Sequence, residues 1–313
     1  MQLVNTFYCA MYFQQTVKNP VSLSGIGVHS GKIVDVAIKP APANSGITFK
    51  RVDVSSNNLI KASYENVVET QLCTVVANES GLKVSTIEHI MSAFWGLGID
   101  NALVEVNAEE MAILDGSSAP FVAAVDRVGV AIQGAMRKYI KIKKEICITD
   151  ADKFVRLSPS DEPSVECSVD FNHPMIGYQK ASFAEMSGNY GHEISRARTF
   201  GFVKEIEVLK NMGLARGGSL ENAIGVSETE ILNPEGLRYK NEFAKHKLLD
   251  LVGDLYLAGH RVIGKIEAHK CGHHLNNMML RRLFASPEVF DTVEMMVPFS
   301  RFSGKLYNNI SQK

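Results

Sequence analysis

The stretch KVSTIEHIMSAFWGLGIDNALVEV, residues 83–106, decides the fold class because the period of its apolar residues changes along it. The apolar side chains at helical spacing are Ile87, Ile90, Met91 and Phe94. They predict a helix that ends at Gly96 and Gly98, and the alternation in residues 102–106 predicts a strand directly after it. One short stretch therefore joins a helix to a strand.

The same mixture continues on both sides of this stretch. We expect further strands at residues 33–38, 139–149, 165–171 and 261–268, and further helices at about 115–128, 241–258 and from 274 onward. Interleaved strands and helices indicate the α+β class. The least structured composition lies near residues 133–135, so we expect two domains, 1–134 and 135–313.

The composition is that of a folded globular chain: 313 residues, 45% of them apolar and 21% charged. A formal net charge of -1 argues against a nucleic-acid binder. No apolar run approaches the ~20 residues that span a bilayer, and the N-terminus lacks the basic region of a signal peptide, so we expect a cytoplasmic protein without an integral membrane segment. The five cysteines form an odd set without a CxxC pair, which favours reduced thiols.

The strongest local signal is HKLLD, residues 246–250. Its spacing puts His246 and Asp250 one turn apart on one helix face, where both can bind one metal ion. Asp254 lies a further turn along, where a carboxylate can orient a ligand imidazole. A solvated polar face, or an ordinary i, i+4 pair, explains the same spacing.

Glu88 and His89 form a second candidate, a general base beside a metal ligand. Ser85 and Glu88 also fit a capping box, with Ser85 as N-cap, and spacing alone favours capping. The third candidate is HKCGHH, residues 269–274, which is either a polar turn or a site for an acid or metal-binding histidine.

Eight separated blocks then occur in order. They are GIGVHSGK (25–32), STIEH (85–89), GLGIDN (96–101), LDGS (114–117), DFNHP (170–174), ISRARTFGF (194–202), HKLLDLVGD (246–254) and GHHLNN (272–277). Together they resemble the UDP-3-O-acyl-N-acetylglucosamine deacetylase family, the zinc hydrolases of lipid A synthesis. The resemblance implies two α+β domains, each with a small sheet layered against helices, and an active site between them.

By this resemblance, zinc is held by His89, His246 and Asp250, and a fourth position stays open for water. A set of two histidines and one aspartate suits Fe²⁺ as well. The resemblance assigns Glu88 as the general base and His273 as the group that stabilises the oxyanion and protonates the leaving amine. Thr199 assists at the oxyanion, and Asp254, His29 and Asp115 surround the site.

The resemblance also implies a small-molecule substrate, a UDP-linked acylated aminosugar, and we expect a monomer. Lys247 is matched to a residue that contacts the diphosphate, although it points away from the helix face that carries His246 and Asp250. Lys270 assists in binding the diphosphate. The other implied substrate contacts are Phe200 on the sugar, Phe171 near the uridine, and Cys73. Residues 202–224 resemble an insert that forms an apolar passage for the 3-O-acyl chain, with Ile206, Val208, Leu209, Leu214 and Ile224.

Two stretches depart from the family pattern. Residues 1–10 precede the usual start and are interpreted as a start-site extension. Residues 108–114, AEEMAIL, replace a turn that more often contains proline, and we expect them to lie far from the ligands. The rival interpretations are a zinc amidohydrolase for another acylated aminosugar, an inactive ligand-binding relative, and a structural protein without a metal.

Overall fold

The computed structural model describes residues 12–184 and 189–294. The suggested extension at residues 1–10 lies outside this part. Two five-stranded sheets dominate the structure. The first has the order β2 (Val21–Ile26), β3 (Ile33–Pro40), β9 (Ala102–Val106), β4 (Ile47–Arg51) and β5 (Leu59–Lys61). The second has the order β12 (Ile146–Asp150), β13 (Lys153–Ser158), β19 (Lys265–His269), β14 (Ser164–Phe171) and β15 (Gly177–Ala184).

The two large sheets share one topology. In each, the strand that comes last in the chain lies at the centre, between the second and third strands. That central strand pairs in parallel with the third strand, β4 in the first sheet and β14 in the second, while the other pairs are antiparallel. A helix precedes each central strand and another follows it: α2 (Glu88–Leu97) and α3 (Ala119–Val128) in the first half, α6 (Glu242–Leu255) and α7 (His273–Phe284) in the second.

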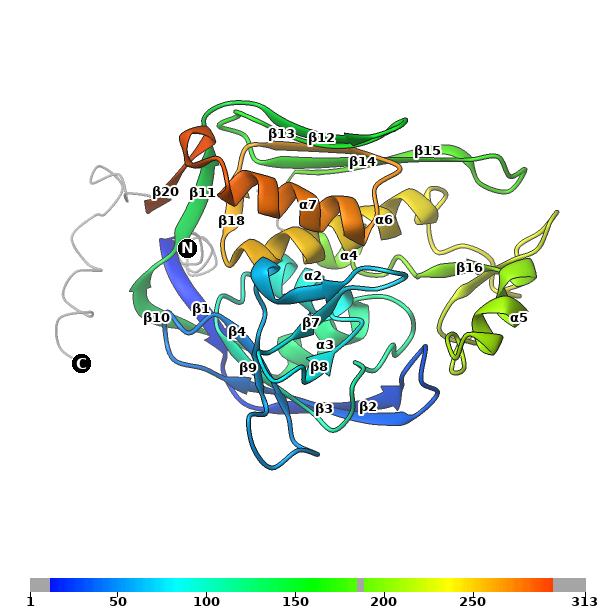
Figure 1. The fold of residues 1–313 in the computed structure, drawn as a ribbon, viewed down its shortest axis with the longest axis horizontal. Helices are drawn as coiled ribbons and strands as arrows, with labels where there is room; N and C mark the ends of the chain where they lie inside the picture. Colours follow the sequence, from blue (N-terminus) through cyan, green and yellow to red (C-terminus); the bar gives the residue numbers. More distant parts are fainter. Residues whose placement is uncertain (1–11, 185–188, 295–313) are drawn as a thin grey trace.

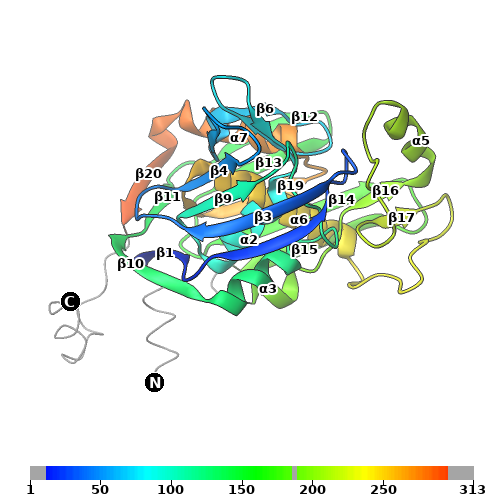
Figure 2. The same ribbon diagram turned by 90° about the horizontal axis from the view of Figure 1, so that it is seen from below.

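These helices lie between the sheets (Figure 1). α6 packs on β14 and β15, α7 packs on β12 and β13, and α2 contacts both α3 and α6. Figure 2, turned by 90° and seen from below, shows the face of the first sheet, with β3 and β2 in front of α2. The α+β class predicted from the sequence is confirmed, and α2 and α6 meet at the middle of the molecule.

Smaller elements complete the structure. They are the pair β1 (Phe13–Val17) and β10 (Val130–Met136); the sheet of β11 (Lys138–Ile142), β18 (Arg261–Ile263) and β20 (Phe290–Glu294); the sheet of β6 (Val67–Glu69), β7 (Val75–Ala77) and β8 (Lys83–Val84); the pair β16 (Phe200–Phe202) and β17 (Ile224–Val226); the helices α4 (Tyr190–Glu193) and α5 (Val203–Asn211); and 3₁₀ turns at Tyr64–Asn66, Tyr256–Ala258 and Pro287–Val289. The suggested boundary after residue 134 falls inside β10, and the division into two domains stays a prediction.

Two stretches that the sequence predicted as single strands each form two separate strands in the structure. Residues 139–149 form β11 and β12, which belong to different sheets, and residues 261–268 form β18 and β19, separated at Gly264. A Cβ at Gly264 would lie 2.9 Å from the carbonyl oxygen of Ser158, so the chain changes sheets where another backbone passes closely. Apolar alternation does not reveal such a break because it continues on both sides.

The start of α2 also differs from the prediction. The helix begins at Glu88 after Ile87, with no side-chain cap, so Ser85 is not its N-cap. Thr86 adopts φ 60°, and Ser85 instead exchanges backbone hydrogen bonds with Glu109 and Met111. Glu88 is therefore released from a capping role. The predicted end is confirmed, since Gly98 closes the helix in the left-handed conformation.

Candidate active site

Three buried side chains from α2 and α6 converge where the two helices meet. The donor atoms of His89, His246 and Asp250 all lie within 4.8 Å of one another. Asp250 Oδ1 is 3.3 Å from His246 Nε2 and 3.7 Å from His89 Nε2. The close approach of the helices depends on Gly253, where a Cβ would lie 2.2 Å from the carbonyl oxygen of Glu88. The sequence therefore uses a glycine to bring the three groups together.

These residues fit a divalent metal ion. Ligand atoms about 2.0–2.2 Å from a tetrahedral zinc ion lie about 3.4 Å apart, close to the spacings of Asp250 Oδ1 from the two imidazoles. Among the described residues nothing hydrogen-bonds the buried Asp250 Oδ1. A buried carboxylate oxygen without a partner is costly, and a cation would satisfy it. The cluster is a possible metal site of the kind that the HKLLD spacing suggested.

The surroundings of His246 and Asp250 favour the protonation states in which these side chains can bind a metal ion. Burial lowers the pKa of His246 to about 3, so the imidazole is neutral at pH 7. Burial would raise the pKa of Asp250, but His246 and the ammonium of Lys247 outweigh it and hold that pKa well below its usual range. Neutral imidazole and ionised carboxylate are the forms that bind metal.

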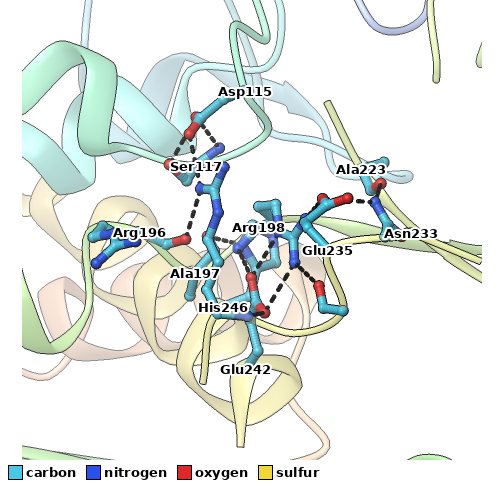
Figure 3. Close-up of polar contacts among 12 residues, drawn as sticks. Asp115, Ser117, Arg196, Ala197, Arg198, Ala223, Asn233, Glu235, Glu242 and His246 are labelled. Atoms are coloured by element: carbon cyan, nitrogen blue, oxygen red, sulfur yellow. Dashed lines mark hydrogen bonds and ion pairs between the residues drawn. The ribbon is translucent and has the colours of Figure 1, made fainter. Parts of the chain in front are cut away.

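The His246 ring has a defined orientation (Figure 3). Its Nδ1 lies 3.1 Å from the carbonyl oxygen of Ala197. A carbonyl can only accept, so Nδ1 carries the hydrogen and Nε2 presents its lone pair toward Asp250. Ligand histidines in proteins are commonly oriented in this way.

Glu88 and His273 lie beside the cluster as a carboxylate–imidazole pair. Glu88 Oε1 is 3.9 Å from His273 Nε2, while Glu88 Oε2 accepts a hydrogen bond from the backbone N–H of Thr74 at 3.0 Å. Burial raises the pKa of Glu88 to about 7. Such a carboxyl group is well matched to take up and release a proton near neutral pH.

His273 is the charged histidine of the site. Its Nδ1 donates to Asp254 Oδ2 at 2.8 Å, and Asp254 also accepts hydrogen bonds from Asn276 and from the Thr74 hydroxyl. Burial alone would lower the pKa of His273, but the carboxylates of Asp254 and Glu88 outweigh it and raise that pKa to about 10. His273 is thus a proton donor at neutral pH, held at the start of α7.

A cavity of about 490 Å³ opens beside these groups. Glu88, His89 and Thr199 are among the residues that line it, and the rest of its wall is mainly apolar. Its apolar wall includes Val28, Leu72, Ile113, Phe200, Ile206, Leu209, Leu220, Ile224 and Leu232. The polar groups therefore share a cavity with an apolar wall that suits an alkyl chain.

Comparison with known proteins identifies the family of this chain. A family model for UDP-3-O-acyl N-acetylglycosamine deacetylase matches residues 14–285. The UDP-3-O-acyl-N-acetylglucosamine deacetylase of Shewanella violacea is 46% identical over 307 residues, which is 95% of this chain and 100% of that protein. The corresponding enzyme of Shewanella pealeana is 47% identical over 285 residues, 90% of this chain and 93% of that protein.

The chain belongs to this deacetylase family. The resemblance seen in the eight sequence blocks is therefore confirmed, and so is the prediction of an amide-hydrolysing enzyme. None of the helices in residues 12–184 and 189–294 combines the length and the apolar character needed to cross a bilayer.

The structure places the predicted family residues at different distances from the cluster. Thr199 lines the cavity and is fixed by backbone hydrogen bonds to Gly116 and Ile224. The Phe200 ring stacks edge-on against Phe171 and lies 6.3 Å from the His246 ring. The Phe200 ring therefore borders the His89–His246–Asp250 cluster, and Phe171 packs against Phe200.

Lys247 was expected to lie off the helix face that carries His246 and Asp250, but its side chain reaches back to Asp250. Its Nζ donates to Asp250 Oδ2 at 2.8 Å and lies 5.7 Å from the centre of the Phe200 ring. A long side chain at i, i+3 can bend back along the helix to the carboxylate, which the Cα position alone does not show. The cation that neutralises Asp250 is thus its neighbour along α6.

Four further predicted residues lie outside the cluster itself. Lys270 pairs with Asp152 at the surface, with 2.6 Å between Nζ and Oδ2. Cys73 is buried, and burial with the nearby Glu88 charge raises the pKa of its thiol to about 12. Asp115 accepts from Ser117 and pairs with Arg238. His29 lines the cavity, and burial lowers its pKa.

Residues 108–114 contribute to the cavity wall. The buried carboxylate of Glu110 accepts hydrogen bonds from the backbone N–H groups of His29 and Ser30, and Ile113 lines the cavity. The stretch therefore reaches the cavity wall after β9, while its distance from the three proposed ligands stays a prediction. A glutamate outside any periodic element gives no sequence signal for such a contact.

Sequence reasoning also missed Thr74, which bonds Glu88 through its N–H and Asp254 through its hydroxyl. Within the suggested apolar insert, Ile206, Leu209 and Ile224 line the cavity, whereas Val208 is 59% exposed. α5 therefore turns one face to the cavity, and Val208 lies on the other.

Proposed function

We propose that this protein hydrolyses the N-acetyl group of UDP-3-O-acyl-N-acetylglucosamine, the deacetylation step of lipid A synthesis, and that His89, His246 and Asp250 hold a catalytic zinc ion. The supporting observation is the convergence of these three groups with the Glu88–His273 pair beside an apolar cavity. The relatives are named as deacetylases of the same substrate.

A bound divalent metal would polarise the acetamide carbonyl and lower the pKa of a water molecule. Glu88 takes a proton from the attacking water. Thr199, on the cavity wall, donates to the oxygen that becomes negative, and His273 gives its proton to the departing nitrogen. Acetate and the free amine are the products.

The cavity supports the choice of an acylated substrate. Its volume of about 490 Å³ and its aliphatic wall suit a 3-O-linked acyl chain next to the reacting acetamide. Lys247 and Lys270 are proposed to meet the diphosphate, and Phe200 and Phe171 the sugar and uridine. Comparing turnover of substrates with and without the 3-O-acyl chain separates this proposal from a deacetylase for another aminosugar.

Metal identity is tested together with activity. We place the enzyme in the cytoplasm, with zinc as the metal and Fe²⁺ as the alternative that the same donors suit. Acetate release should stop after thorough chelation and return on adding Zn²⁺, with one metal per chain by elemental analysis. Full activity in metal-free protein would refute the proposal.

A further inference from the structure

One peptide unit, between Ala197 and Arg198, is held at both ends by α6 (Figure 3). Its carbonyl accepts a hydrogen bond from His246 Nδ1 at 3.1 Å. Its N–H donates to Glu242 Oε1, also at 3.1 Å. Glu242 and His246 are four residues apart in α6, so one turn of a single helix holds both sides of the peptide.

The planarity of the peptide bond links these two contacts. The carbonyl oxygen and the amide hydrogen lie in one plane, so holding the N–H also fixes the direction of the carbonyl. We propose that Glu242 is a positioning residue that orients the ligand imidazole of His246 through this peptide. The inference rests on the metal site of the proposed function.

Glu242 is itself rigidly held. Its carboxylate is 0% exposed and receives Arg198 Nε at 2.9 Å and Nη2 at 3.3 Å, together with the N–H of Arg238 at 2.5 Å. The guanidinium of Arg198 is anchored in turn by the carbonyl of Gly236 and by Glu235. The acceptor for the peptide N–H is thus fixed by a fork of charged hydrogen bonds.

The consequence for His246 follows from its tautomer. While the carbonyl points at Nδ1, the hydrogen stays there and Nε2 is free to bind metal. Without Glu242 the peptide can rotate and the ring loses its only described partner at Nδ1. Loss of an outer partner of a metal-binding histidine weakens metal affinity by about 10–100-fold.

A matched control is available in the same chain. Asp100 also accepts a buried arginine fork, from Arg137 Nε at 2.9 Å and Nη2 at 2.7 Å, and a backbone N–H, from Gln15 at 2.7 Å. In the described part of the chain its carboxylate bonds Arg137 and Gln15 and none of the three proposed ligands. Glu242→Gln and Asp100→Asn therefore remove the same kind of charge, one next to the cluster and one away from it.

The experiment titrates the metal-free wild type and both variants with Co²⁺ and with Zn²⁺ against a chelator, and records the visible spectrum of bound Co²⁺. We expect Glu242→Gln to bind about 10–100-fold more weakly with an altered Co²⁺ spectrum, and Asp100→Asn to bind like the wild type. Equal affinities and spectra for all three proteins would overturn the inference. A wild type that binds neither metal would instead refute the proposed function.

A second variant covers the case in which Glu242→Gln does not fold. Replacing a buried ion pair by apolar residues of similar volume is often neutral for stability, so the double variant Arg198→Met/Glu242→Met should fold. Methionine has no oxygen to accept the peptide N–H, whereas the glutamine of the single variant keeps one, and we expect Co²⁺ and Zn²⁺ binding in the double variant to be weakened at least as much. Wild-type affinity in the folded double variant would contradict the role of Glu242.

Discussion

His246 in α6 and His273 at the start of α7 are both buried, yet their surroundings shift their pKa values in opposite directions. The pKa of His246 falls to about 3 and that of His273 rises to about 10. At Nδ1 the first meets a neutral carbonyl, that of Ala197, and the second meets the carboxylate of Asp254. In the proposed mechanism, the acceptor at Nδ1 distinguishes the metal-binding histidine from the proton donor.

Each acceptor is set by a different part of the fold. The carbonyl comes from the loop before β16, whereas Asp254 lies on α6, one turn after Asp250. Gly253, between Asp250 and Asp254, lets α2 pack closely against α6. Glu88 of α2 then lies 3.9 Å from His273. α6 therefore supplies two of the three proposed ligands, His246 and Asp250, and one turn later the partner of the acid, Asp254.

The largest effect is expected at the neutral histidine. His246→Ala removes a ligand, and because a catalytic metal contributes several kcal/mol to the transition state, activity should fall by about 10³-fold or more. Acetate release and metal content measure both losses. A variant that keeps stoichiometric metal and wild-type turnover would remove His246 from the ligand set.

Glu88→Gln separates the base from the ligands. The amide cannot accept the proton of water, so kcat should fall by about 10²–10⁴-fold. The three ligands are unchanged, so metal content should stay at the wild-type level. Loss of the metal along with activity would show that Glu88 acts chiefly by supporting His89.

The charged histidine predicts the alkaline side of the pH profile. A donor with a raised pKa is protonated below that pKa, so activity should decline as the pH rises through about 10. Asp254→Asn removes the anion that raises the pKa of His273, and burial then favours the neutral ring. We expect the alkaline limb to move to lower pH, and neutral-pH turnover to fall by about 10²-fold or more.

An unchanged alkaline limb in Asp254→Asn, with turnover lowered, would mean that Asp254 holds the His273 ring in place without setting its charge. Metal content serves as the control, because the Asp254 carboxylate bonds Thr74, His273 and Asn276 rather than the side chain of a proposed ligand.

Helical spacing predicted the parts of this site that belong to one helix. His246, Asp250 and Asp254 follow the period of α6, and so their shared face could be read from the sequence. The joining of α2 to α6 depends on tertiary packing, and for His89 the link came from the family blocks rather than from spacing. Periodicity also placed most strands but merged β11 with β12 and β18 with β19.

Contacts made through single backbone groups were not predictable. Thr74 lies between β6 and β7, and Glu110 lies in the irregular stretch after β9. Thr74 is 14 residues along the chain from its partner Glu88, and Glu110 is 81 residues from its partner His29. No helical or strand period connects such positions. Arg198 stood in a matching family block, but its pairing with Glu242 appears only in three dimensions.

Gly253→Ala tests whether the two histidines depend on the close approach of α2 and α6. The added Cβ would lie 2.2 Å from a backbone oxygen, which cannot move aside like a flexible side chain. We expect the free energy of unfolding to fall by about 1–3 kcal/mol and turnover to drop, because Glu88 shifts. Gly134→Ala, with nothing within 4 Å, is the control. Denaturant titration would contradict the prediction if both variants lost the same amount.

Thr74→Val should have the smallest effect and the opposite sign to Asp254→Asn. Valine keeps the shape and the N–H that bonds Glu88, but removes the hydroxyl that donates to Asp254 at 2.6 Å. With one donor fewer, Asp254 holds the proton on His273 more firmly, so the pKa of His273 rises. We expect the alkaline limb to move to higher pH with turnover reduced about tenfold. Thr74→Ser retains the hydroxyl and should restore the wild-type limb; a limb that moves equally in both variants would show that only side-chain packing at Thr74 matters.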